Sequence, residues 1–560
     1  MLCALWVAVA VASCTAPPAA GQVADLLIVN GQVFTADDQN STAQAVAIAG
    51  STILRVGTDE ELAALKGPAT RVIDAHGATV APGFNDSHVH FLNGGDTLGD
   101  VDLAGLTTLP QLQDAIHSFA TGKADAAWVK GRGWLYSPFP GGTPTKAQLD
   151  ASVSDRPAVM TCYDGHSIWV NSKALAMAGV TKDTPNPANG VIVKDPRTGE
   201  PTGHLKESAT ELVTRIMPKP TEADRRAALR TAVAHAHRFG VTSVQNAGGA
   251  PEEMALYDQA RRAGELQVRT YLAFSVEAGT SEADLDRMEE IRKQFGDHPT
   301  LKTGAVKIYA DGVIESRTAA LLAPYSNSKD AGSPNLSADE MNRLVSMVDK
   351  RGWQIWIHAI GDRAIRMSLD AFERAATTNP APARGRRHRL EHIETIDAAD
   401  IPRFGRLGVI ASQQPMHVPL GDMNSTTPSG PWPDNIGPDR FSRAWAWKSI
   451  HDAGGRLAFG SDWPVAPLSA GQGIWAAATR TGPPNAVDQK LPMRDVIRGY
   501  TSWPAYASFE DQRKGTLAPG MLADIVVLST DIMAQPPTKA GDIVVDTTIF
   551  DGKVVYEKPR

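Results

Sequence analysis

The sequence predicts an α/β protein in which a closed (β/α)8 TIM barrel is joined to a composite β-sandwich built by the two ends of the chain. Two observations predict this fold. The middle of the chain alternates helical patterns with short apolar segments, which indicates parallel strands connected by helices. The first and last segments instead alternate short apolar runs with glycine-containing turns, which is typical of strands joined by tight turns.

The first 22 residues read as an export leader followed by a tether. Residues 2–13 form an apolar run that is too short to span a bilayer and has the length of a signal-peptide core. The run leads into Val11-Ala-Ser-Cys14, which resembles the bacterial lipobox, although no Lys or Arg stands before Trp6. We therefore expect an exported protein, either in the bacterial periplasm or anchored to a membrane through a lipid on Cys14. A secreted protein is the alternative.

Two β-rich segments, residues 23–80 and 505–560, flank the middle of the chain. Apolar runs such as Asp25–Asn30 end at an Asn-Gly turn, and residues 515–528 and 544–556 repeat this pattern. Because the ends of a domain often lie close together, we expect both segments to form one composite β-sandwich.

Residues 81–504 form the predicted barrel. Three helical segments begin with a capping Ser or Thr and end at a glycine, at 221–240, 281–296 and 337–352. Eight apolar segments are the candidate strands, at 78–90, 241–245, 268–274, 305–310, 354–358, 389–393, 409–414 and 456–462. The span exceeds the ~250 residues of a typical barrel. We therefore expect an insertion at about 95–218, between the first two strands.

Composition narrows the classes of function. The chain has 560 residues and a formal net charge of −7, which argues against nucleic acid or an anionic membrane surface as the main partner. Its three cysteines, Cys3, Cys14 and Cys162, are too few after the leader for a disulfide framework or a cysteine-rich zinc site. A small-molecule substrate is the expected partner, and a homo-oligomer is left open.

Side chains that can bind metal stand at the ends of the predicted strands. His88 and His90 are two residues apart at the end of the first strand, so both imidazoles would leave the same face. The active sites of such barrels lie at the carboxyl ends of the strands. The full candidate set is His88, His90, Lys307, His358, His392 and Asp462. Each residue alone has a structural alternative, such as a core histidine or a turn aspartate, but their joint placement on five strand ends predicts a metal site.

Several longer stretches surround these residues, and they form a recognisable combination. They are Pro82–His90, Val306–Gly312, Ser316–Leu321, His358–Ala364, Arg387–His392, Gly460–Val465 and Leu517–Asp524, with Gly131–Trp134 and Asp164–Lys173 in the insertion. In these stretches the chain resembles the amidohydrolase superfamily, and more closely its family 3 branch, which includes N-substituted formamide deformylases. The resemblance covers nearly everything after residue 25. Val313-Ile-Glu315 departs from the Ser-Leu-Gly that often follows Ala-Asp-Gly in relatives, which leaves the pocket shape near Arg317 open.

The resemblance implies a divalent metal centre, usually zinc, and hydrolysis of C–N bonds other than peptide bonds, in amides, formamides or N-acyl compounds. We expect two Zn²⁺ ions per chain, one held by His88, His90 and Asp462 and the other by His358 and His392. A metal-bound hydroxide would attack the carbonyl carbon, and Asp462 would act as general base and acid. The alternatives are a deaminase, lactonase or isomerase on the same metal barrel, and an exported binding protein without catalysis.

Lys307 is the unusual member of the set, because an ammonium group has no lone pair to offer a metal. A cation beside a divalent ion is repelled by ~4 kcal/mol per unit charge pair at 4 Å with an effective dielectric constant of 20. The lysine would therefore lose its proton or react with CO₂, and we expect a bridging carbamate on Lys307. The alternative is that Lys307 pairs with a carboxylate such as Asp311 and that only one metal ion binds.

Substrate contacts are expected from the insertion and from the loops that follow the strands. The candidates are Trp134, His166, Arg317 and His417. Arg317 could bind a carboxylate or orient a carbonyl group, and its structural alternative is to brace a loop.

Overall fold

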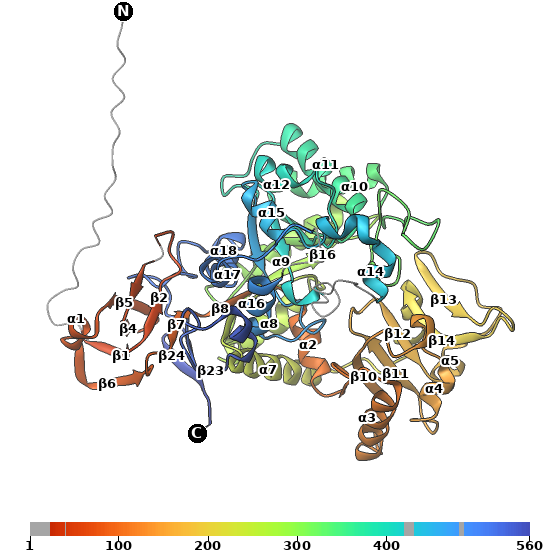
Figure 1. The fold of residues 1–560 in the computed structure, drawn as a ribbon, viewed down its shortest axis with the longest axis horizontal. Coiled ribbons are helices and arrows are strands. Elements are labelled where there is room, and N and C mark those ends of the chain that lie inside the picture. The colour runs from red at the N-terminus through yellow and green to blue at the C-terminus, as the bar shows by residue number, and fades with distance from the viewer. Residues whose placement is uncertain (1–22, 40, 419–429, 481–485, 560) are drawn as a thin grey trace, which may run out of the picture.

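The computed structural model describes residues 23–39, 41–418, 430–480 and 486–559 (Figure 1). The predicted leader, the lipidation site Cys14 and the tether lie outside these residues. In the described part of the chain, no helix is both long and apolar enough to span a membrane.

The centre of the molecule is an eight-stranded parallel sheet that is nearly closed into a barrel, as the sequence predicts. Its strands follow one another in chain order from β8 to β21. They are β8 (Phe84–Val89), β15 (Val241–Asn246), β16 (Arg269–Ser275), β17 (Leu301–Tyr309), β18 (Gln354–Ala359), β19 (Arg389–His392), β20 (Ile410–Gln413) and β21 (Arg456–Phe459). Five of these strands are buried along their whole length, and β16, β17 and β21 are nearly so, because helices cover the outside and side chains fill the inside.

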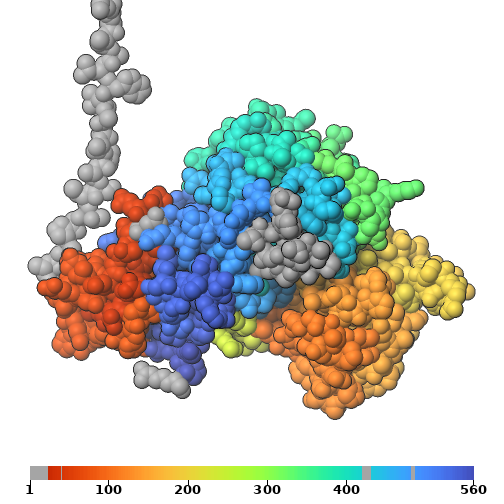
Figure 2. All heavy atoms as spheres, viewed as in Figure 1, coloured from red at the N-terminus to blue at the C-terminus, as the bar shows by residue number. Residues whose placement is uncertain are grey.

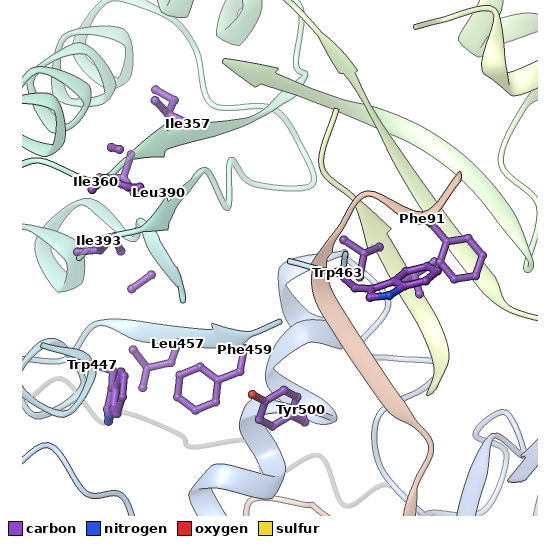
Figure 3. Packing of buried hydrophobic residues seen from close by; sticks show 14 of the residues in the cluster. Phe91, Ile357, Ile360, Leu390, Ile393, Trp447, Leu457, Phe459, Trp463 and Tyr500 are labelled. Atoms are coloured by element: carbon purple, nitrogen blue, oxygen red, sulfur yellow. The ribbon is translucent and has the colours of Figure 1, made fainter. Parts of the chain in front are cut away.

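The barrel closes just beyond the ends of its first and last strands. The amide of Asp462 donates to the carbonyl oxygen of His88 at 2.7 Å, and the amide of His90 donates to that of Trp463 at 2.7 Å. The side chains beside these residues also pack together, since the rings of Phe91 and Trp463 lie 6.0 Å apart (Figure 3). The seam of the barrel therefore fixes two of the segments that carry candidate ligands.

The continuous first strand predicted for residues 78–90 is wrong. The structure divides it into β7 (Thr79–Pro82), which belongs to the outer sheet, and β8 in the barrel. The break falls at Gly83, where a Cβ atom would come within 2.3 Å of the Thr242 side chain. Because only glycine tolerates this approach, the chain changes sheets here.

Helices surround the barrel. Those that lie between or after the barrel strands are α7 (Glu222–Arg238), α8 (Glu253–Arg262), α9 (Glu282–Phe295), α10 (Ala338–Lys350), α11 (Asp362–Thr378), α12 (Ile401–Leu407), α14 (Pro431–Ile436), α15 (Trp447–Asp452), α16 (Ala470–Thr479), α17 (Met493–Gly499) and α18 (Ser502–Ala507). The three predicted helices are α7, α9 and α10, and their caps are those predicted: Thr221, Ser281 and Ser337 each accept from the backbone three residues on.

The two ends of the chain form the predicted composite β-sandwich. One sheet has the order β5 (Thr52–Gly57), β4 (Ala45–Ala49), β1 (Ala24–Val29) and β6 (Lys66–Asp74). The other has the order β24 (Lys553–Glu557), β23 (Val545–Phe550), β22 (Ile525–Leu528), β7, β2 (Gln32–Phe34) and β3 (Thr42–Ala43), so strands from both ends pair within it (Figure 1). Helix α1 (Asp59–Ala63) packs beside the first sheet.

Alternate residues of β22 hold the sandwich to the barrel. Ile525 and Val527 enter the core between the two sheets, while Val526 and Leu528 pack on the barrel's own core. This alternation follows from the two-residue period of a strand and makes β22 a buried layer between two cores.

The residues between α2 (Phe91–Thr97) and α7 fold as a lobe at the side of the barrel, orange to yellow in Figure 2. Its six-stranded sheet has the order β13 (Gly190–Lys194), β14 (Pro201–Glu207), β12 (Ser167–Val170), β11 (Ala158–Cys162), β10 (Val129–Trp134) and β9 (Val101–Asp102). Helices α3 (Leu109–Gly122), α4 (Lys146–Asp150), α5 (Ser172–Ala178) and α6 (Glu211–Thr214) accompany it. The loop between β11 and β12 carries His166 to the barrel, where its ring lies 5.6 Å from that of His358.

Candidate metal centre

The six predicted ligands come together at the carboxyl end of the barrel. They are His88 on β8, His90 after it, Lys307 on β17, His358 on β18, His392 on β19 and Asp462 after β21. All are buried except His90, whose side chain is 28% exposed. Asp462 lies at the centre of the set, because each of its two oxygens faces a different group of imidazoles.

The first group of ligand atoms comprises His88, His90 and Asp462, which lie within 4.8 Å of one another. Oδ1 of Asp462 is 3.4 Å from Nε2 of His88 and 3.2 Å from Nε2 of His90. Nζ of Lys307 lies 3.3 Å from the same His88 nitrogen. The expected partners of the first ion are therefore together, with Lys307 beside them.

The second group comprises His392, His417 and Asp462. Oδ2 of Asp462 is 3.9 Å from Nδ1 of His392 and 3.7 Å from Nε2 of His417. His417 was expected to contact substrate, but here it stands among the candidate ligands. It comes from the short turn Pro415–His417 after β20, and the only sequence signal for this position was a histidine just after a barrel strand.

His358 lies beside the second group without joining it. Its ring is 4.5 Å from the ring of His392, but its Nε2 is 3.2 Å from the carbonyl oxygen of Gly312. The alternative partner for Lys307, Asp311, is engaged elsewhere, since its oxygens accept from the backbone amides of Ala320, Ile360 and Gly361.

A buried ion pair between Glu391 and Arg389 contacts His88 of the first group. Oε2 of Glu391 lies 2.6 Å from Nδ1 of His88, and Oε1 of Glu391 accepts from Nε of Arg389 at 2.8 Å. All three side chains are fully buried. Such a carboxylate fixes the ring orientation of a ligating histidine and raises its basicity. We did not predict Glu391 or Arg389, although their two-residue spacing on β19 places them on one face.

Ionisation in the site suits a divalent cation. Burial lowers the pKa of the His88 imidazole to about 4 and that of Lys307 to about 8. Burial also lowers the pKa of His392 well below its usual value. Burial alone would raise the pKa of Asp462, but its interactions with His88 and His90 outweigh burial, so that this pKa lies well below its usual value. Neutral imidazoles around a carboxylate are the forms that ligate zinc.

Unpartnered atoms also fit a metal. Oδ1 of Asp462, Nδ1 of His392 and Nε2 of His417 are buried and have no hydrogen-bond partner among the described residues. Leaving such groups unpaired in a protein interior is costly, and one divalent cation at each of the two groups would satisfy them.

The backbone is strained at two of these residues. Asp462 has φ 60° and His392 has φ 75°, both in the left-handed region that side chains other than glycine avoid. Strain of this kind costs of order 1–3 kcal/mol per residue and is concentrated at functional sites.

A small cavity of about 30 Å³ opens on the second group. Histidines and carboxyl groups dominate its lining: Asp164, His166, Glu315, His358, His392, Glu394, His417 and Asp462. His166, a predicted substrate residue, is thus in place, and its Nδ1 lies 2.9 Å from Oε2 of Glu207.

Two predicted substrate residues lie away from this cavity. Trp134 is fully buried in the core of the lobe, where its indole donates to the carbonyl oxygen of Met160 at 2.7 Å. Arg317 is exposed on a turn and does not line the cavity. We therefore no longer assign either residue to substrate binding.

The nearly closed barrel, its outer sandwich and the two His/Asp groups define a (β/α)8 protein with a candidate metal site at the carboxyl end of its strands. The chain belongs to the amidohydrolase family, whose family model matches residues 71–556. It is 32% identical over 545 residues to YtcJ of Bacillus subtilis (strain 168), a protein named as an amidohydrolase, covering 94% of this chain and 98% of that one. It is 28% identical over 550 residues to the N-substituted formamide deformylase of Arthrobacter pascens, covering 96% and 99%.

Among solved structures, an uncharacterized metal-dependent hydrolase from Pyrococcus horikoshii OT3 has the same fold, with a TM-score of 0.70 and 24% identity over 91% of this chain and 99% of that one. The family and the fold support a hydrolase, and together with the His/Asp groups they support a divalent metal.

Proposed function

We propose that the protein hydrolyses a C–N bond in an amide, formamide or N-acyl compound, with two divalent ions, zinc in our proposal, at the two groups of ligand atoms. One observation carries the proposal: Asp462 presents one oxygen to His88 and His90 and the other to His392 and His417. A single carboxylate shared by two groups of imidazoles suits two cations better than one.

Bound metal would supply an activated water and polarise the carbonyl of the substrate. Asp462 would accept the proton of that water and pass it to the departing amine. Glu391 holds the His88 ring by a 2.6 Å contact, and His166 lies at the cavity wall within reach of substrate. The role of Asp462 is favoured by its position at the centre of the site and by its unpaired Oδ1.

Lys307 would carry a carbamate derived from CO₂. The ammonium first loses one proton, and the neutral amine then attacks the carbon of CO₂. A C–N bond forms as one C=O π bond opens, and a second proton leaves the nitrogen, so the charge changes from +1 to −1. The side chain is fully buried beside His88, where an ammonium next to two divalent ions would be repelled by ~4 kcal/mol per unit charge pair at 4 Å. We also propose that the chain is exported, on the evidence of its leader sequence.

The test begins with protein that lacks residues 1–22 and has been loaded with Zn²⁺ in the presence of bicarbonate. Elemental analysis should find about two zinc ions per chain. Release of amine is then measured across a panel of small formamides, N-acyl amines, esters and lactones. Turnover of amides supports the proposal; turnover of esters or lactones alone, or protein that binds no metal, contradicts it.

A further inference from the structure

Two glutamates of the cavity, the half-buried Glu315 and the buried Glu394, lack a cationic partner among the described residues. Oε1 of Glu315 accepts from the hydroxyl of Tyr163 at 2.6 Å, and Oε2 of Glu394 accepts from the indole of Trp432 at 2.7 Å. Within the described part of the chain, neither makes an ion pair with Lys, Arg or His. A third carboxyl group, that of Asp164, lines the same cavity.

Buried carboxylates elsewhere in this molecule are compensated. Glu391 pairs with Arg389 at 2.8 Å, and Glu510 pairs with Lys514 at 2.9 Å. Asp311 has no cation but accepts from three backbone amides. By comparison, Glu315 and Glu394 each have one neutral side-chain donor.

Two cationic groups, His166 in the cavity lining and Arg132 beside Tyr163, are already engaged. His166 lines the cavity, but its Nδ1 pairs with Glu207 at 2.9 Å. Arg132 donates to the backbone oxygens of Pro464 and Tyr163, each at 2.8 Å. Because a buried carboxylate without a counter-charge is costly, the cavity is better suited to a positively charged ligand than to an empty state.

Within the described residues, no group of three ligand atoms that lie within 4.8 Å of one another includes Glu315 or Glu394. The two carboxyl groups therefore belong to no metal-sized cluster and favour an organic cation over a further metal ion. An ammonium or guanidinium suits them, because its several N–H donors point in different directions.

The same cavity reaches the candidate metal centre. Oδ1 of Asp462 and Nδ1 of His392 are buried and unpartnered, and both residues line it. A cation held by the glutamates would therefore lie next to the reacting bond.

We propose that the enzyme selects substrates that carry a primary ammonium or guanidinium group a few bonds from the scissile C–N bond, and that Glu315 and Glu394 bind this group. That the cationic molecule is a substrate rests on the proposed hydrolase function. That the cavity binds a cation rests on the cavity alone.

Two probes of equal size test the inference. N-formyl-1,3-diaminopropane ends in an ammonium group, and N-butylformamide has a methyl group in its place. Calorimetric binding is measured on metal-stripped protein, where the proposed hydrolysis does not occur. We expect wild type to bind the cationic probe at least tenfold more tightly than the neutral one.

The double variant Glu315→Gln/Glu394→Gln should lose this preference and bind the neutral probe as wild type does. The matched control, Glu60→Gln/Glu211→Gln, removes two exposed carboxyl groups that do not line the cavity and should keep the preference. Equal binding of the two probes by wild type overturns the inference, and so does the absence of measurable binding of either probe. A preference for the cationic probe that survives in the folded double variant also overturns it. If wild type prefers the cation but the zinc-loaded enzyme releases amine from neither probe, the formamide hydrolase proposal fails and the cation site stands.

Discussion

The two ends of the barrel differ in whether their buried charged groups have partners inside the protein. At the amino end, Nη2 of Arg269 lies 2.9 Å from Oδ1 of Asp524 and 2.9 Å from Oδ1 of Asp551, which ties β16 to the composite sandwich. Nearby, Glu510 lies 2.9 Å from Lys514 and 3.4 Å from Lys302. Charges here are matched inside the protein.

At the carboxyl end, charges and lone pairs are left unmatched. Asp462 and His392 have buried atoms without partners, and Glu315 and Glu394 have no counter-charge among the described residues. Burial of a charged group therefore does not by itself identify a functional site. A buried group that the chain compensates supports the fold, whereas a buried group that it leaves uncompensated is available to a ligand.

The largest effect is expected at the centre of the carboxyl end. Asp462→Asn should lower kcat/KM by about 10²–10⁴-fold, because the amide cannot accept a proton. Steady-state kinetics and elemental analysis together check this, since most of the metal should remain. Activity within tenfold of wild type would rule out the proton-transfer role, and the exposed Asp452→Asn is the matched control.

At the amino end, Arg269→Met should destabilise the protein by about 3–5 kcal/mol, because it leaves Asp524 buried without its cation. Urea unfolding measures this change, and the specific activity of the folded fraction should not change. The exposed pair Arg71 and Glu557 gives the control, since Arg71→Met should cost less than about 1 kcal/mol. A clear fall in specific activity with Arg269→Met would contradict the proposal that charges at the amino end support the fold and not the activity.

A pair of variants, Glu391→Gln at the carboxyl end and Glu510→Gln at the amino end, compares the two ends in one experiment. The first is Glu391→Gln. It should weaken metal binding by about 10–100-fold, because Glu391 orients the ring of His88. Glu510→Gln also removes a buried glutamate from a cation, but at the amino end, and should leave metal affinity unchanged. Competition with a chelating dye measures both, and equal losses in the two variants would contradict the comparison.

The smallest effect concerns Glu315 and pH. Burial raises the pKa of this carboxyl above its usual value, so the folded state holds a proton that the unfolded state has already released. Glu315 therefore contributes a loss of stability as pH rises from about 4.5 toward about 7, and this contribution should be absent in Glu315→Gln. The difference between the urea midpoints of the two proteins should change between pH 5 and pH 8, with wild type losing more stability, and a constant difference would contradict the raised pKa of Glu315.

Much of the fold could be predicted because its signals are local. The caps Thr221, Ser281 and Ser337 begin helices where the pattern places them, and each of the eight predicted barrel segments overlaps a barrel strand. The division of residues 78–90 into two strands could not be predicted, since it depends on the approach of Gly83 to Thr242, a residue distant in sequence.

The candidate site shows the same limit. His88, His90 and Asp462 were found from their positions at strand ends, because the carboxyl ends of parallel strands meet at one mouth. Trp134 was misplaced because an aromatic residue near a binding loop has the same sequence signal whether it faces a pocket or the core of a lobe.

By itself, the sequence determined the barrel and the pairing of the two ends, and it put forward His88, His90 and Asp462 as candidate metal ligands, because period, caps and strand-end positions are properties of short segments. Only the tertiary structure decided that His417 joins Asp462 and His392, that Glu391 and Arg389 hold His88 from below, and that Glu315 and Glu394 line one cavity without a cation. These relations join residues far apart in the chain, and whether a buried charge is compensated depends on all of its neighbours in space.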